Sequence, residues 1–209
     1  MSASMSKSII TAVFLTLAIA CGARTSLSTV WKAPAARAPV TRILVIAIAD
    51  NPISKRSFED TFAAELNSRG AEAAPSYLVL PADERLNEEM VREVVRQRDI
   101  EAVAITRLLK VDEEQQYVPP RTDYARGPYY HGGLYGYYGS AYDVVHTPGY
   151  WRTVTIVRLE TRLYDAQTAD LIWAAESDTF DPTSTADTIQ SVTKAVSKRI
   201  AADGLISKP

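Results

Sequence analysis

Residues 42–49 form an unbroken aliphatic run that is apolar at every position after Arg42. A strand that is apolar on both faces must be covered on both faces, as a central strand of an α/β sheet is. Asp50, Asn51 and Pro52 end the run, because proline keeps the residue before it out of helical geometry. This run therefore predicts an α/β fold organised around a buried first strand.

Helical and strand patterns then alternate along the chain. That order predicts right-handed crossovers and a sheet whose first half is parallel. In chain order we expect a helix over 55–69 capped by Ser54 and ended by Gly70, a strand over 72–80 with 77–80 its strongest part, a helix over 88–98 capped by Asn87, and a strand over 101–111 whose Val103, Ile105, Leu109 and Val111 share one face.

The second half of the chain predicts antiparallel strands. Residues 152–164 alternate apolar and charged side chains, and residues 171–175 return as a strand after a turn. A final helix then follows residues 181–184, with Ile189, Val192, Val196 and Ile200 on one face and Leu205-Ile206 packing back behind Gly204. We expect one α/β domain over 42–207, with a mixed sheet in two or three layers: β-α-β-α-β, antiparallel β-β and a C-terminal helix.

A tyrosine- and glycine-rich insert, residues 117–150, divides the strand pair and holds nine of the eleven tyrosines. Long loops of this kind are usually functional or disordered, and Tyr and Trp supply contact area at low entropy cost. Three interpretations stay open: binding of a partner or glycan, a self-packed or disordered hairpin tip, and contact with a membrane surface. The candidate contact residues are Tyr129, Tyr130, Tyr135, Tyr137, Tyr138, Tyr142, Tyr150 and Trp151.

Residues 1–20 have the pattern of a secretory signal peptide, with Lys7 before a short apolar run. The run is too short to span a bilayer of about 30 Å as a helix. Cys21, the only cysteine, follows Leu-Ala-Ile-Ala, which resembles the lipobox of bacterial lipoproteins, although alanine stands at 18 where leucine is usual. We expect lipidation of Cys21; the alternative is an ordinary cleavage site that leaves a free thiol.

Residues 21–41 are rich in Ala, Ser, Thr and Pro, and predict a lipidated N-terminus followed by a mostly flexible tether. Trp31 is unusual in a linker. Residues 28–31 therefore have two interpretations: a short edge strand that docks on the domain, or a disordered arm with one apolar residue.

The chain resembles a group of uncharacterised Gram-negative envelope lipoproteins. The resemblance covers nearly all of the mature chain, including Tyr-Asp-Ala-Gln-Thr at 164–168, Thr-Phe-Asp-Pro at 179–182 and Gly-Tyr-Tyr-Gly at 136–139. It implies no catalytic residues, and Ala169 departs from it because glycine is usual in that turn. More distantly, the element order is similar to the TolB N-terminal domain, LpoB and CsgG, which are interaction or assembly modules; this is fold-level analogy.

The sequence offers little that predicts catalysis. His131 and His146 are the only histidines, and a metal site that Asp123 or Asp143 completes is the weaker interpretation of them. No nucleophile elbow or phosphate loop is present. Asp50 and Asn51 stand at the carboxyl end of the first strand, where α/β sheets often bind ligands, but turn formation is the simpler explanation for both. We expect no enzyme activity, no cofactor and no metal.

Composition sets the remaining limits. The net charge of −2 disfavours binding to nucleic acid. The sequence predicts a periplasm-facing lipoprotein of the cell envelope that acts as a binding or assembly module, with an envelope protein as the expected partner and a glycan as the alternative. Gly22, rather than aspartate, after the cysteine favours the outer membrane under the sorting rule of enteric bacteria. The alternative function is binding of a small ligand or cell-wall glycan in the cleft near Asp50 and Asn51.

Overall fold

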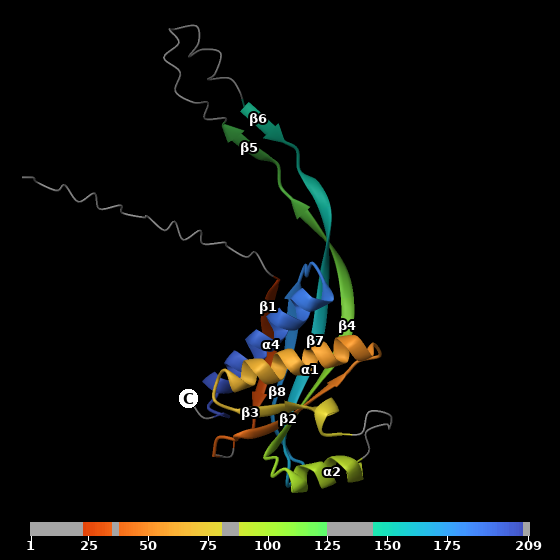
Figure 1. The fold of residues 1–209 in the computed structure, drawn as a ribbon. Helices are drawn as coiled ribbons and strands as arrows, with labels where there is room; N and C mark the ends of the chain where they lie inside the picture. The colour runs from red at the N-terminus through yellow and green to blue at the C-terminus, as the bar shows by residue number, and fades with distance from the viewer. Residues whose placement is uncertain (1–22, 35–37, 81–87, 125–143, 207–209) are drawn as a thin grey trace, which may run out of the picture.

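The computed structural model describes residues 23–34, 38–80, 88–124 and 144–206 (Figure 1). The expected α/β class is confirmed: a mixed sheet is packed with helices. The elements are β1 (Arg24–Lys32), β2 (Arg42–Ile48), α1 (Pro52–Asn67), β3 (Glu72–Pro75), the short 3₁₀ turn η1 (Ser76–Leu78), α2 (Glu88–Gln97), β4 (Ala102–Val118), β5 (Arg121–Tyr124), β6 (Val144–Thr147), β7 (Tyr150–Asp165), β8 (Leu171–Phe180) and α4 (Thr185–Ala202).

Six strands form one sheet in the order β1-β8-β7-β4-β2-β3. The β3, β2 and β4 strands run parallel, whereas β7, β8 and β1 join the sheet antiparallel. This is the predicted division into a parallel and an antiparallel half. The strands β5 and β6 form a separate two-stranded ribbon.

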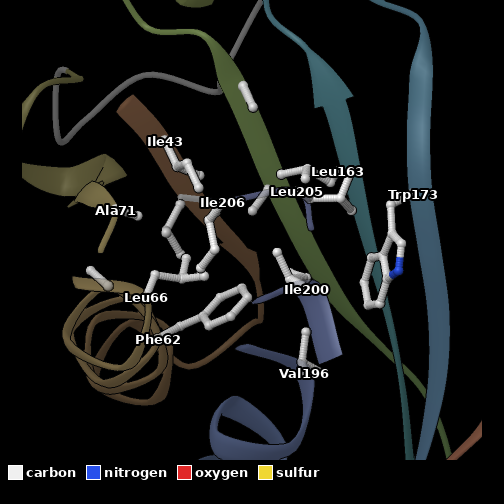
Figure 2. Packing of buried hydrophobic residues seen from close by; sticks show 14 of the residues in the cluster. Ile43, Phe62, Leu66, Ala71, Leu163, Trp173, Val196, Ile200, Leu205 and Ile206 are labelled. Carbon is white, nitrogen blue, oxygen red and sulfur yellow. The ribbon is translucent and has the colours of Figure 1, made fainter. Parts of the chain in front are cut away.

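Helices α1 and α4 cover one face of the sheet and enclose the larger core (Figure 2). The aliphatic positions predicted for the last helix are buried, and Leu205 and Ile206 pack back behind it as expected. The indole nitrogen of Trp173 donates a hydrogen bond to Asp203 Oδ2 at 2.8 Å, which fixes the end of α4 against β8. The residues labelled in Figure 2 are Ile43, Phe62, Leu66, Ala71, Leu163, Trp173, Val196, Ile200, Leu205 and Ile206.

The other face of β2 carries a second, smaller core. Leu44 and Ile46 pack there with Val103, beneath the partly buried Met90 and Val94 of α2. Ile43 and Val45 face the larger core. The first strand is therefore covered on both faces, as its unbroken apolar run predicts.

The first helix begins earlier than Ser54 predicts. Pro52 takes the first helical position, and Asn51 Oδ1 accepts hydrogen bonds from the amides of Ile53 (2.9 Å) and Ser54 (3.2 Å). Proline suits this position because its missing N–H would have had no helical partner. Gly70 ends the helix region with φ +98°, the left-handed conformation expected of it.

The strand predicted over 72–80 is shorter than expected. β3 ends at Pro75, and Tyr77, placed in the strongest part of that strand, lies in the turn η1. The Glu59 carboxylate on α1 captures this turn: it accepts hydrogen bonds from Ser76 Oγ (2.8 Å) and from the Tyr77 amide (3.3 Å). A tertiary contact has thus replaced a local strand preference.

The prediction that Val103, Ile105, Leu109 and Val111 share one face is wrong. A β-bulge between Leu108 and Lys110 inserts one residue into β4, so the alternation of side chains reverses there. Leu108 pairs with Leu159 and Val111 pairs with Val157, and both pairs lie on the face of the larger core. Val103 and Ile105 remain on the opposite face.

Much of the segment expected to be a tether is a strand. Arg24–Lys32 form β1, which pairs antiparallel with β8 over its whole length, and Trp31 is opposite Ala174. Leu27 and Val30 are partly buried against the larger core, and this burial offsets the conformational entropy lost when the strand becomes ordered. Of the two interpretations of residues 28–31, the edge strand is the one that the structure bears out.

Candidate functional site: a projecting arm and a cleft at its base

β4 and β7 continue well beyond the sheet. β2 pairs with β4 only as far as Arg107, and β8 pairs with β7 only from Ile156. Beyond these points, among the described strands, residues 108–118 pair only with β7 and residues 150–155 pair only with β4. Residues 113–118 and 150–155 pair with one another as a two-stranded ribbon, and the ribbon of β5 and β6 lies farther along (Figure 1). We call residues 108–118 and 150–155 the arm. Both of its outer edges present backbone groups without a strand partner within the described residues.

Aromatic side chains are exposed near the described end of the arm. Tyr117 and Trp151 form a cross-strand pair with ring centroids 5.1 Å apart, and they are 49% and 66% exposed. Tyr150 is 52% exposed. A Cβ atom added at Gly149 would lie 2.2 Å from Tyr117 Oη, so the tyrosine ring rests directly over the glycine backbone. Glycine at 149 is therefore what allows this packing.

The structure describes two of the eight predicted contact residues, Tyr150 and Trp151, and both are exposed on the arm. The other six, Tyr129, Tyr130, Tyr135, Tyr137, Tyr138 and Tyr142, lie outside the described residues. The prediction did not name Tyr117 as a contact. Tyr117 could have been found because it begins the insert that Tyr150 ends, so a pairing of the flanking strands would bring it opposite Tyr150 and Trp151.

The arm has an acidic stretch on β4. Asp112 pairs with Lys110 at 2.9 Å, and Glu113 and Glu114 follow. On β7, Arg152 donates to Gln116 Oε1 (3.0 and 2.8 Å) and reaches Asp181 at 3.3 Å. These polar groups require water or a polar partner around the ribbon.

A cleft of about 710 Å³ lies at the base of the arm, between the N-terminal ends of α1 and α4. It sits at the carboxyl end of β2, where the sequence places the alternative binding site. The bulge in β4 shapes it, because the bulge brings both Leu108 and Val111 to this face. Its walls are Ala47, Ile48, Ala49, Phe58, Leu108, Val111, Val157, Leu159, Pro182 and Ile189, and its polar groups come from Asp50, Asn51, Ser54, Thr106, Ser184, Thr185 and Thr188. Arg107 also lines the cleft, but its guanidinium is bound to Glu160.

Several of these polar groups already make hydrogen bonds within the fold. Asn51 caps α1, Ser184 Oγ accepts from the Asp187 amide at 3.1 Å to cap α4, and Thr188 Oγ1 donates to the Ser184 carbonyl. Thr106 and Thr161 share a buried hydrogen bond of 3.0 Å. The turn-forming explanation therefore holds for Asn51. The cleft offers mainly apolar walls with a hydroxyl-bearing rim.

Charge on the opposite face of the sheet is internally compensated. Glu160 lies between Arg107 and Arg162, with 2.7 Å to each. Burial opposes ionisation of Glu160, but the two guanidinium hydrogen bonds outweigh it and hold the pKa of this carboxyl below its usual range. Arg158 pairs with Asp178 at 2.6 Å beside them. This network is a solvated sheet face without the geometry of an acid–base pair.

The predicted histidine and aspartate ligands cannot be assembled from the described side chains. His131 and Asp143 lie outside the described residues, and of Asp123 and His146 only the backbone, on β5 and β6, is described. Among the residues that the structure does describe, no group of three His, Cys, Asp or Glu side chains is close enough to hold a metal ion. None of the described helices is long and apolar enough to cross a membrane.

No family model and no curated protein matches the chain significantly. Among solved structures, the chain is similar to the PelC dodecamer from Paraburkholderia phytofirmans, with a TM-score of 0.46 and 13% identity over 83% of this chain and 95% of that one. It is also similar to the lipoprotein GNA1162 from Neisseria meningitidis, with a TM-score of 0.43 and 14% identity over 78% of this chain and 99% of that one.

Proposed function

We propose that this chain is a membrane-anchored lipoprotein of the cell envelope that acts as a non-catalytic binding or assembly module. Its protein contact is the arm together with the tyrosine-rich insert that the arm carries. The leader and Cys21 support the anchor, and Gly22 favours the outer membrane with the domain facing the periplasm. The body of the domain serves to hold the arm in place.

The observation that carries this proposal is the ribbon itself. A two-stranded ribbon is marginally stable in water when nothing else covers it, and this one extends past the sheet with both edges open. Open strand edges are templates for an added strand, which is a recurrent mode of protein recognition. Exposed Tyr and Trp beside those edges add contact area of the kind enriched at interface centres.

The test of the arm is photo-cross-linking in native envelopes. A photoreactive amino acid at position 150 should yield a discrete adduct with one partner protein, because Tyr150 is 52% exposed on the arm. The same group at position 31 is the control, since Trp31 is a 45% exposed aromatic far from the arm on β1. Deletion of residues 123–148 should abolish co-purification of that partner and leave folding intact. An unchanged partner profile after the deletion would remove the main support.

The lipid anchor has its own test. Replacement of Cys21 by alanine should move the protein from the membrane fraction to the soluble periplasmic fraction, because it removes the acylation site. Mass spectrometry of the N-terminal peptide of the unchanged protein should show a diacylglyceryl-modified Cys21. A free thiol on that residue would instead support the ordinary cleavage site.

The cleft supports a second candidate function, binding of a small ligand or a cell-wall glycan fragment. Its volume is in the range of small-molecule sites, and its apolar wall with a hydroxyl rim suits the face of a sugar ring or an apolar group. An Ala49→Trp change would fill the cleft, while Ile53→Trp, at a residue that does not line it, is the matched control. Loss of muropeptide binding in Ala49→Trp but not in Ile53→Trp would support this function. Muropeptide binding should persist after deletion of residues 123–148.

A further inference from the structure

The chain enters the domain at a fixed point. The amide of Ala23 donates a hydrogen bond to Asp187 Oδ1 at 3.0 Å, and Ser191 Oγ donates to the Ala23 carbonyl at 2.8 Å. Both partners lie on the first two turns of α4. The residue that follows Gly22 is therefore held at the N-terminal end of α4.

The arm leaves the domain at the same end. Arg24 pairs with Phe180, and Phe180 pairs with Ile156, so these three residues form one row across β1, β8 and β7. Ile156 is the point beyond which β7 continues into the arm. Figure 1 shows the start of β1 at the end of the body from which β4 and β7 project, with α2 at the opposite end. We call the end that bears Ala23 and the arm the arm pole.

We propose that the arm pole faces the membrane and that Trp151 and Tyr117 contact the lipid–water interface. The inference rests on lipidation of Cys21, which belongs to the proposed function, and goes beyond it. Only two peptide units separate Cys21 from the anchored Ala23, and they span at most about 7 Å. β4 meets the row of Ile156 at Asp112, and from there to Val118 it extends about 20 Å at the rise of a β-strand. A tether this short holds the base of a much longer arm at the bilayer surface.

The chemistry of the arm places it on the membrane surface and not across the membrane. Trp and Tyr concentrate at headgroup level because their rings are amphipathic. A ribbon with open edges cannot enter the hydrocarbon, where unpaired backbone groups cost several kcal/mol each. Asp112, Glu113 and Glu114 add charge that stays in water, and they disfavour anionic lipid. The arm therefore lies along the surface of a zwitterionic leaflet.

The tryptophans supply the test. Trp151 is on the arm, Trp31 is opposite Ala174 near the far end of β1, and Trp173 is fully buried in the core. The variants Trp31→Phe and Trp151→Phe each keep Trp173 as a constant background and leave the core unchanged. Each lipidated full-length variant is reconstituted in phosphatidylcholine vesicles that contain phosphatidylcholine brominated at a chosen acyl position.

The expected result is quenching by bromolipid in Trp31→Phe, which keeps Trp151, and loss of that quenching in Trp151→Phe. Bromine near the headgroup should quench more than bromine near the end of the acyl chain. Equal quenching of the two variants, an unquenched Trp151, or deeper quenching by chain-end bromine would each overturn the proposal, as would an unmodified Cys21. A cross-linked protein partner without quenching of Trp151 would refute this inference alone, whereas quenching without such a partner would refute the protein contact alone.

Discussion

The carboxylate of Glu59 accepts a hydrogen bond from the backbone amide of Ala47 at 2.9 Å, inside the fold and away from solvent. β3 pairs with β2 only as far as Val45, so the amide of Ala47 has no strand partner on that side. Glu59 supplies the missing acceptor and also receives Ser76 and Tyr77. A helix side chain thus completes the sheet edge next to the cleft.

Replacement of Glu59 by alanine should lower the free energy of unfolding by about 3 kcal/mol, because it leaves buried donors of Ala47, Ser76 and Tyr77 without an acceptor. Glu59→Gln should cost less, since one oxygen remains. Urea denaturation measures both. Glu65→Ala, which removes only the partly exposed pair with Arg69, is the control and should cost about 0.5 kcal/mol or less. A Glu59→Ala loss no larger than that of the control would contradict this role.

In the turn between β7 and β8, substitution of Ala169 by glycine should stabilise the protein. Ala169 has φ +62°, a left-handed conformation that costs an alanine about 1–2 kcal/mol. Asp165 Oδ1 holds the turn through the amides of Gln167 (2.7 Å) and Thr168 (2.8 Å), so the conformation does not depend on glycine. Ala169→Gly should therefore raise the free energy of unfolding by up to about 1 kcal/mol.

The control for that change is Ala166→Gly in the same turn, where φ is not positive. This variant should lose about 1–2 kcal/mol, because glycine adds freedom to the unfolded chain and also removes a methyl group that packs against the smaller core. Thermal unfolding by differential scanning calorimetry compares the two. A destabilised Ala169→Gly variant would show that the left-handed conformation carries no strain.

The sequence predicted correctly those features that residues close together in the chain determine. The apolar spacing of the last helix, the glycine stops at Gly70 and Gly204, and the doubly apolar first strand were all confirmed. The cleft beyond β2 also lies where α/β topology places ligand sites. For these features, the residues that form the pattern are also those that determine the structure.

Features that depend on distant partners were missed. The turn at Tyr77 exists because Glu59 reaches it across the fold, and a preference for strand within residues 77–80 says nothing of that contact. The bulge at Leu108 reverses the alternation of β4, which no count of apolar positions in β4 alone reveals. For the start of α1, Asn51 and Ser54 are both good caps, and only the rule for proline at the first helical position separates them.

The anchoring of β1 to α4 should depend on pH. Hydrogen bonds from the amides of Thr183 and Ala23 hold the pKa of the Asp187 carboxyl below its usual range. A depressed folded pKa means that the contribution to stability is complete above the unfolded value and is lost as pH falls through the folded one, so below about pH 4. The protection factors of the Ala23 and Arg24 amides, which NMR gives as exchange rates relative to the intrinsic chemical rate at the same pH, should therefore fall in acid.

Asp187→Asn separates this effect from general acid unfolding. At neutral pH the variant should show lower protection factors at the start of β1 than the wild type, and these should fall less in acid, because its side chain does not titrate. Amides of β2, remote from Asp187, serve as the internal reference. An unchanged pH profile for Ala23 and Arg24 in the variant would exclude Asp187 as the titrating group.

Gly149 predicts how the aromatic pair of the arm is held. Its missing Cβ leaves room for Tyr117, whose Oη and Cζ would lie 2.2 and 2.8 Å from an added methyl group, and Pro120 Cδ would lie 3.0 Å from it. Gly149→Ala must therefore push the Tyr117 ring away and disturb its packing on Trp151, 5.1 Å distant between centroids. In a Trp31→Phe background, Trp151 emission should shift and become more accessible to iodide. The free energy of unfolding should change little, because the arm lies outside both cores. Gly204→Ala is not a suitable control, because Gly204 has φ +72°, which strains any other residue. Tyr117→Ala is the control. It should show the same Trp151 emission as Gly149→Ala if Gly149 serves to keep the Tyr117 ring on Trp151.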